Sequence, residues 1–91
     1  MKTLTTKAIE SELEQLNNWK FENNSIQKEF KFKNFAEALA FIVQTGILAE
    51  KQNHHPEIQN VYNKVSVRLT THDSDGVTEK DIKLAAAIDK I

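Results

Sequence analysis

The sequence predicts an α+β fold of order α-β-β-α-β-β-α, with a four-stranded antiparallel sheet that carries three helices on one face. Apolar residues recur at helical spacing in three segments, which predicts the helices. Between these segments apolar and polar residues alternate, which predicts two pairs of strands. Strands that follow one another without an intervening helix are typical of antiparallel sheets.

Length and composition limit the class of protein. A chain of 91 residues supports one hydrophobic core, so we expect a single domain over residues 1–91. A domain of this size buries only about 60 to 65% of its unfolded surface, which favours association of subunits. Twelve basic residues nearly balance thirteen acidic ones, so we expect no nucleic-acid and no membrane partner. The absence of cysteine and of any signal-peptide-like or membrane-spanning stretch predicts a cytoplasmic protein.

The first predicted helix begins after Thr5, a residue type that caps helix N-termini, and ends at the Asn17-Asn18 pair. Its apolar positions recur at helical spacing: Ile9, Leu13 and Leu16. A β-hairpin follows, with its turn at Asn23-Asn24. Large apolar residues alternate along it: Trp19, Phe21, Ile26, Phe30 and Phe32. We interpret its aromatic residues, together with Tyr62, as core and not as a stacking platform for a planar ligand.

The second predicted helix is capped by Asn34 and Glu37 and runs to about Lys51. A broad apolar stripe follows it: Phe35, Ala38, Leu39, Ile42, Val43 and Ile47. Pro56 cannot continue a helix and restricts the residue before it to an extended conformation. We therefore expect the His54-His55 pair on the connection between this helix and the next strand, a position that often carries function.

The second predicted hairpin has strands over residues 58–62 and 65–69, with a turn at Asn63-Lys64. His72 is expected at the end of its second strand.

The third predicted helix follows a loop at residues 73–76. Thr78 and Asp81 have the spacing of a capping box, in which each residue's side chain bonds the other's backbone amide. The helix directs four apolar residues inward: Ile82, Ala85, Ala86 and Ile88.

The three histidines of the chain are the candidates for acid/base chemistry. His54 and His55 are adjacent, and hairpin geometry can return His72 toward them. Imidazole, with an unperturbed pKa of about 6.5, gives and takes protons near neutrality. The cluster therefore predicts a general acid/base site. The alternative interpretation is that His54-His55-Pro56 is a polar turn and His72 an exposed strand end.

Three imidazoles can also hold a catalytic zinc ion. Adjacent residues of an extended backbone point to opposite sides, so His54 and His55 are poorly placed to bind one ion. The stretch 73–76 suggests a calcium loop, but its glycine comes too early and no glutamate follows at ligand spacing. We therefore expect no metal.

Residues 50–65, followed by residues 70–73 and 84–85, resemble the pterin-4a-carbinolamine dehydratase family. The pattern joins an acidic residue, a His-His-Pro triplet, an aromatic residue, a histidine and an aspartate at set intervals. This chain has every term: Glu50, His54, His55, Pro56, Tyr62, His72 and Asp81. Similar residues at Trp19, 30–32 and 34–36 extend the resemblance over nearly the whole chain.

The resemblance implies dehydration of 4a-hydroxytetrahydropterin to quinonoid dihydropterin and water in tetrahydrobiopterin recycling, downstream of an aromatic amino-acid hydroxylase. It implies a lyase with no cofactor, because the pterin is the substrate. His54 and His72 would serve as acid and base, and His55 would orient the pterin. Pro56 would fix the loop, and four backbone positions would bind the pterin edge: Thr71, His72, Asp73 and Ser74.

The resemblance also implies homodimers or homotetramers, in which an edge strand pairs across subunits and the long helix joins a bundle. The family includes proteins that act as dimerisation or assembly cofactors, so a non-catalytic binding role is the alternative function. The intact histidine set favours the enzyme. Asn53 departs from relatives that carry aspartate there, and an amide cannot favour a neighbouring imidazolium as a carboxylate does.

Overall fold

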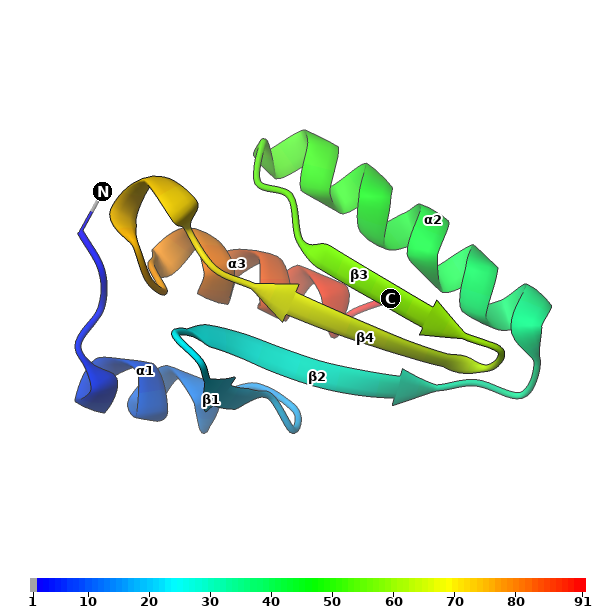
Figure 1. Cartoon of the computed structure of the whole chain (residues 1–91), viewed down its shortest axis with the longest axis horizontal. Helices are drawn as coiled ribbons and strands as arrows, with labels where there is room; N and C mark the ends of the chain where they lie inside the picture. Colours follow the sequence, from blue (N-terminus) through cyan, green and yellow to red (C-terminus); the bar gives the residue numbers. More distant parts are fainter. Residues whose placement is uncertain (1) are drawn as a thin grey trace.

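The computed structural model describes residues 2–91 and contains the predicted order of helices and strands (Figure 1). A short 3₁₀ helix, η1, is added before the last helix. The elements have the following bounds: α1 Thr6–Leu13, β1 Lys20–Glu22, β2 Ser25–Lys31, α2 Phe35–Gln52, β3 Glu57–Val61, β4 Lys64–Leu69, η1 His72–Ser74 and α3 Glu79–Ile88. The α+β class predicted from the sequence is therefore confirmed.

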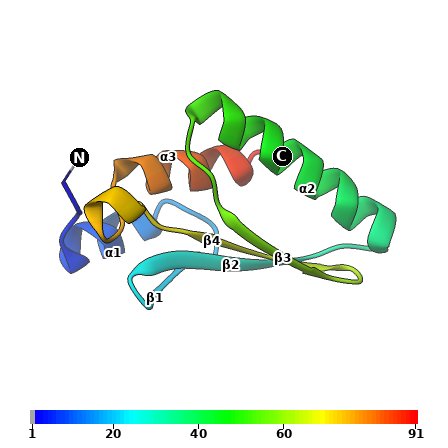
Figure 2. The same cartoon turned by 45° about the horizontal axis from the view of Figure 1, so that its top comes forward.

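The four strands form one antiparallel sheet in the order β1-β2-β4-β3. The central pair, β2 and β4, is in register from Ile26 opposite Leu69 to Lys31 opposite Lys64. In the β3–β4 hairpin, Glu57 lies opposite Arg68. The connection that enters β3 and the segment that leaves β4 consequently meet at the same end of the sheet, as Figures 1 and 2 show.

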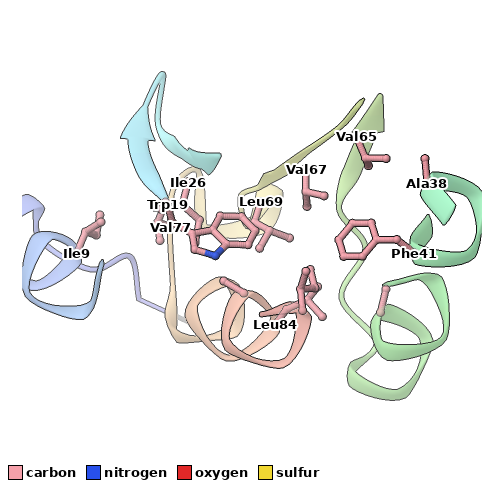
Figure 3. Close-up of a cluster of buried hydrophobic side chains, with 13 residues drawn as sticks. Ile9, Trp19, Ile26, Ala38, Phe41, Val65, Val67, Leu69, Val77 and Leu84 are labelled. Atoms are coloured by element: carbon pink, nitrogen blue, oxygen red, sulfur yellow. The ribbon is translucent and has the colours of Figure 1, made fainter. Parts of the chain in front are cut away.

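The hydrophobic core lies between the sheet and its helices. Strand β4 alternates as predicted, with Val65, Val67 and Leu69 buried and the residues between them partly exposed. Helices α2 and α3 cover this face, and α1 packs at its β1 end (Figure 2). In Figure 3, Phe41 of α2 and Leu84 of α3 point toward the side chains of β4. Helix α3 buries Ala85 and Ile88 as expected and leaves Ile82 and Ala86 partly exposed.

The turn of the second hairpin lies at Tyr62-Asn63, one residue earlier than predicted. Lys64 belongs to β4, where it pairs with Val61, and Tyr62 takes a left-handed conformation with φ of 51°. The Asn60 side chain donates to the carbonyl group of Tyr62 within the turn and to that of Lys64 after it. Tyr62 is thus at the tip and 63% exposed, so its assignment to the core is wrong. The other aromatic residues of that set are buried or packed against the core.

The prediction that His72 ends a strand is also wrong. Strand β4 stops at Leu69, and Thr71 forms an isolated bridge with Gly76. Between these two residues the chain makes η1, which begins at His72. The first helix is likewise shorter than predicted, because α1 ends at Leu13 and residues 14–18 are turns and bends.

Helix α2 has apolar residues on two faces, and of its predicted apolar stripe only Ala38 is buried and Ile42 partly buried. One face packs on the sheet and α3 and contains the buried residues Ala38, Phe41, Thr45 and Ala49. The other face, which we call the outward stripe, contains four large residues that are 43 to 62% exposed: Phe35, Leu39, Val43 and Ile47. None of the helices in residues 2–91 is long and apolar enough to cross a membrane.

Candidate active site

The connection between α2 and β3 carries two of the histidines. Helix α2 ends at Gln52, and Asn53 caps it in the left-handed conformation, with φ of 50°. Asparagine tolerates this conformation better than most residues. The amide of His54 then donates to the Ala49 carbonyl at 3.0 Å, so the chain reverses and enters β3 after Pro56. Asn53 therefore has a backbone role at this turn, whatever its effect on the histidines.

His54 is buried against the first turn of α3. Its Nε2 atom lies 2.5 Å from Oδ1 of Asp81, and the two side chains are 10% and 0% exposed. A carboxylate only accepts hydrogen bonds, so with Asp81 ionised the proton of this contact resides on Nε2. Nδ1 is then the ring nitrogen that Asp81 does not engage. Asp81 is the third residue of α3, where the positive end of the helix dipole favours a negative charge.

The second oxygen of Asp81 is bonded as well. Oδ2 accepts from the Thr78 amide at 2.9 Å and from the Thr71 hydroxyl at 2.8 Å. The predicted capping box of Thr78 and Asp81 is thus confirmed. The Asp81 carboxylate also connects His54 to Thr71, in the segment that follows β4. The sequence predicts Asp81 as a helix cap and a term of the family pattern, but it does not predict the contact of Asp81 with His54 or that of Thr78 with Thr71.

His55 points away from this buried cluster, as expected for neighbours in an extended connection. Its Nε2 lies 3.2 Å from Oε1 of Glu50, and both side chains are mostly exposed. An exposed pair of this kind contributes little stability. His55, Pro56 and Glu50 line one end of an open groove of about 610 Å³ between α2 and β3. The two adjacent histidines therefore occupy different environments.

His72 is exposed on η1, at the same end of the sheet as the α2–β3 connection (Figures 1 and 2). Asp73 is exposed and Ser74 partly so. The amides of Thr71 and Ser74 already donate within the loop, to the carbonyls of Gly76 at 2.9 Å and Thr71 at 3.1 Å. The backbone amide and carbonyl of Thr71 therefore already have hydrogen-bond partners within the loop.

Within the described part of the chain, residues 2–91, no three histidine, aspartate or glutamate side chains are grouped closely enough to hold a metal ion.

The fold and the site define a small α+β protein with a buried histidine–carboxylate pair and two exposed histidines at one end of its sheet. The chain belongs to the pterin 4 alpha carbinolamine dehydratase family, whose family model matches residues 2–91.

Individual relatives agree with this membership. A protein of Prochlorococcus marinus named "Putative pterin-4-alpha-carbinolamine dehydratase" is 52% identical, over a match that covers 91% of this chain and 87% of that protein's length. The crystal structure of a transcriptional coactivator/pterin dehydratase from Brucella melitensis matches with a TM-score of 0.94 and 41% identity, over 98% of this chain and 97% of that one. A pterin dehydratase-like protein described as a RuBisCO assembly factor matches with a TM-score of 0.67, over 82% of this chain and 87% of that one. At 22% identity it shares the fold alone.

Proposed function

We propose that this chain dehydrates 4a-hydroxytetrahydropterin to quinonoid dihydropterin and water. Family membership supports the pterin substrate, and the observation that carries the chemistry is the buried pair of His54 and Asp81. In this reaction the 4a-hydroxyl group gains a proton and leaves as water, while the ring nitrogen beside it loses a proton. Two groups that exchange protons near neutrality satisfy both requirements, and histidine is the side chain suited to that task.

His54 and His72 are assigned to the acid and base roles, which interchange with the stereochemistry of the hydroxyl group. His54 acts through Nδ1, because Asp81 holds its Nε2. His55 orients the pterin from the exposed side, where Glu50 steadies its ring. Pro56 fixes the connection, and the loop at residues 71–74 borders the pterin edge.

Recycling of tetrahydrobiopterin after an aromatic amino-acid hydroxylase is the proposed context, and the cytoplasmic location stays a prediction. The outward stripe of α2 supports a homodimer or homotetramer, since a monomer would expose these four residues to water. The same stripe is the observation that favours the alternative function, a non-catalytic role in binding or assembling another protein.

Stopped-flow absorbance tests the proposal by following the loss of enzymatically generated 4a-hydroxytetrahydropterin. Wild type is expected to accelerate the loss, and the His54→Ala/His72→Ala variant is expected to lose roughly 10² to 10⁴-fold of the rate for each group removed. Gln59→Ala is the control, because Gln59 is exposed on β3, outside the candidate site. With folding verified by circular dichroism, equal and uncatalysed rates for all three proteins would overturn the dehydratase proposal.

A further inference from the structure

Thr71 and Thr78 form a buried contact behind Asp81 that the proposed reaction does not use. Their hydroxyl oxygens are 2.8 Å apart, and Thr71 and Thr78 are 7% and 0% exposed. Thr71 Oγ1 is also 2.8 Å from Oδ2 of Asp81. Thr78 Oγ1 lies 3.2 Å from the amide of Lys80, which donates to it. Each hydroxyl group is thus part of a continuous chain of hydrogen bonds.

The direction of this chain follows from counting protons. A hydroxyl group has one proton, and Thr71 donates it to the carboxylate of Asp81. In the contact between the two hydroxyl groups, Thr78 is therefore the donor and Thr71 the acceptor. The donors then run in one direction: the Lys80 amide donates to Thr78, Thr78 donates to Thr71, and Thr71 donates to Asp81. The Nε2 proton of His54 reaches the other oxygen of the Asp81 carboxylate.

Three donors consequently hold Asp81: the amide of Thr78, the hydroxyl of Thr71 and the ring of His54. Loss of one of them would leave an oxygen of this buried carboxylate with one hydrogen-bond donor fewer. If Asp81 took up a proton from solvent, it could donate that proton to Nε2, and the proton of a neutral His54 would then reside on Nδ1. The Thr71 hydroxyl therefore influences which ring nitrogen of a neutral His54 is unprotonated and able to accept a proton.

Thr71 also shapes the loop that carries the other catalytic histidine. Its amide donates to the Gly76 carbonyl, and its own carbonyl accepts from the amides of Ser74 and Gly76 at 3.1 and 3.3 Å. His72 is the next residue in the chain. Thr71 thus stabilises the loop of His72 through its backbone bonds, and its side chain contacts the Asp81 carboxylate that holds His54.

We propose that Thr71 is a positioning residue, whose hydroxyl keeps Asp81 an acceptor so that His54 retains its proton on Nε2 and presents Nδ1. The catalytic consequence rests on the proposed function, but the effect on the His54 tautomer does not. Thr71→Val removes the hydroxyl at nearly constant shape, and Thr71→Ser keeps it. Thr45→Val is the matched control, because Thr45 is also buried and its hydroxyl has no partner among residues 2–91.

Long-range ¹H–¹⁵N spectra of the imidazole rings test the tautomer without substrate, with His54→Gln assigning the signal. At a pH where the His54 ring is neutral, wild type, Thr71→Ser and Thr45→Val are expected to show the Nε2–H tautomer. Thr71→Val is expected to show a shift toward Nδ1–H. In the dehydratase assay we expect Thr71→Val to lose about tenfold in kcat, the equivalent of one hydrogen bond to a charged group, and Thr71→Ser to restore it.

The proposal would be overturned by a folded Thr71→Val protein that keeps the wild-type tautomer. Should that variant fail to fold, an Nδ1–H tautomer in wild type or in Thr71→Ser overturns it equally. A tautomer shift in Thr71→Val, in a protein whose wild type shows no dehydratase activity, supports the role of Thr71 and contradicts the proposed reaction. Activity with an unresponsive tautomer contradicts only the role of Thr71.

Discussion

His54 and His55 are neighbours in the chain, yet their surroundings differ in burial and in the carboxylate that each contacts. The extended connection points one ring to Asp81 in the interior and the other to Glu50 in solvent. In the buried pair the carboxylate has three donors, which is what burial of a charge requires. In the exposed pair water competes for both partners. The same residue type therefore occurs here in two environments, one buried and held by a carboxylate and the other open to solvent.

Two buried threonines allow a test of hydrogen bonding at the scale of one residue. Thr45 of α2 is fully buried, and its hydroxyl oxygen has no partner within residues 2–91, whereas that of Thr71 is bonded twice. We expect Thr45→Val to raise the free energy of unfolding by about 1 kcal/mol, because it removes an unpaired polar atom. Thr71→Val should lower it by about 2 kcal/mol, because it removes one of the three donors that the buried Asp81 carboxylate accepts from.

Urea denaturation measures both free energies of unfolding. A loss of stability in Thr45→Val would mean that its hydroxyl has a partner, such as a bound water molecule, and would contradict this assignment.

At the scale of the element, α3 is held at both ends by a carboxylate. Asp81 fixes its N-terminal end to His54 and Thr71. At its other end, Asp89 accepts hydrogen bonds from Lys28 at 2.8 Å and from the Trp19 ring nitrogen at 3.0 Å. Helix α3 is thereby tied to the strand β2 and to the segment before β1, and its position sets where Asp81 meets His54.

The Asp89 cluster predicts a stability effect remote from the site. Lys28 and Asp89 have side chains that are only 13% and 8% exposed. We expect Asp89→Ala to lower the free energy of unfolding by about 3 kcal/mol, because it leaves the Lys28 ammonium group buried without its partner. Asp89→Asn should cost less, since its amide oxygen can still accept from Trp19.

The fluorescence of Trp19, the one tryptophan of the chain, reports both urea transitions. Equal losses in Asp89→Ala and Asp89→Asn would show that the charge of Asp89 contributes all of the effect and its acceptor none. A loss below about 1 kcal/mol in both would place the pair with ordinary surface ion pairs.

At the scale of the whole molecule, the outward stripe of α2 is the main feature that a single chain leaves uncovered. Its four residues are spaced four apart, so they follow one side of the helix for about three turns. Phe35 and Leu39 are about half exposed, and Val43 and Ile47 more so. A second copy of the chain that packed on this side would remove the stripe from water, which is the expected source of association energy.

We expect wild type to have the mass of a dimer or tetramer in light scattering, and Val43→Lys/Ile47→Lys to have a lower mass, because two buried charges would oppose association. Gln44→Lys is the control, since Gln44 is an exposed polar residue of the same helix. A monomeric wild type at every concentration would contradict the prediction. Unchanged mass in the double variant would place the interface elsewhere, such as at the free edge of β3.

The local features of this protein could be predicted from its sequence. The caps at Asn34 and at Thr78 depend on residues three positions away, and both occur as predicted. Periods of two and 3.6 residues identified the strands and helices, because a core on one face imposes those periods. The family was likewise identified from the spacing of a few residues. The errors in the bounds of these elements are small. The Tyr62-Asn63 turn, for example, is displaced by one residue, because the strand register decides which residue takes the positive φ.

The tertiary structure decided which distant residues meet. Asp81 lies 27 positions from His54 and ten from Thr71, and no periodicity relates them. Their contact arises because the β3–β4 register and the packing of α3 bring three segments to one end of the sheet. The division of the α2 stripe into an inward and an outward face has the same origin, since hydrophobicity alone does not distinguish a residue that faces this core from one that faces another subunit.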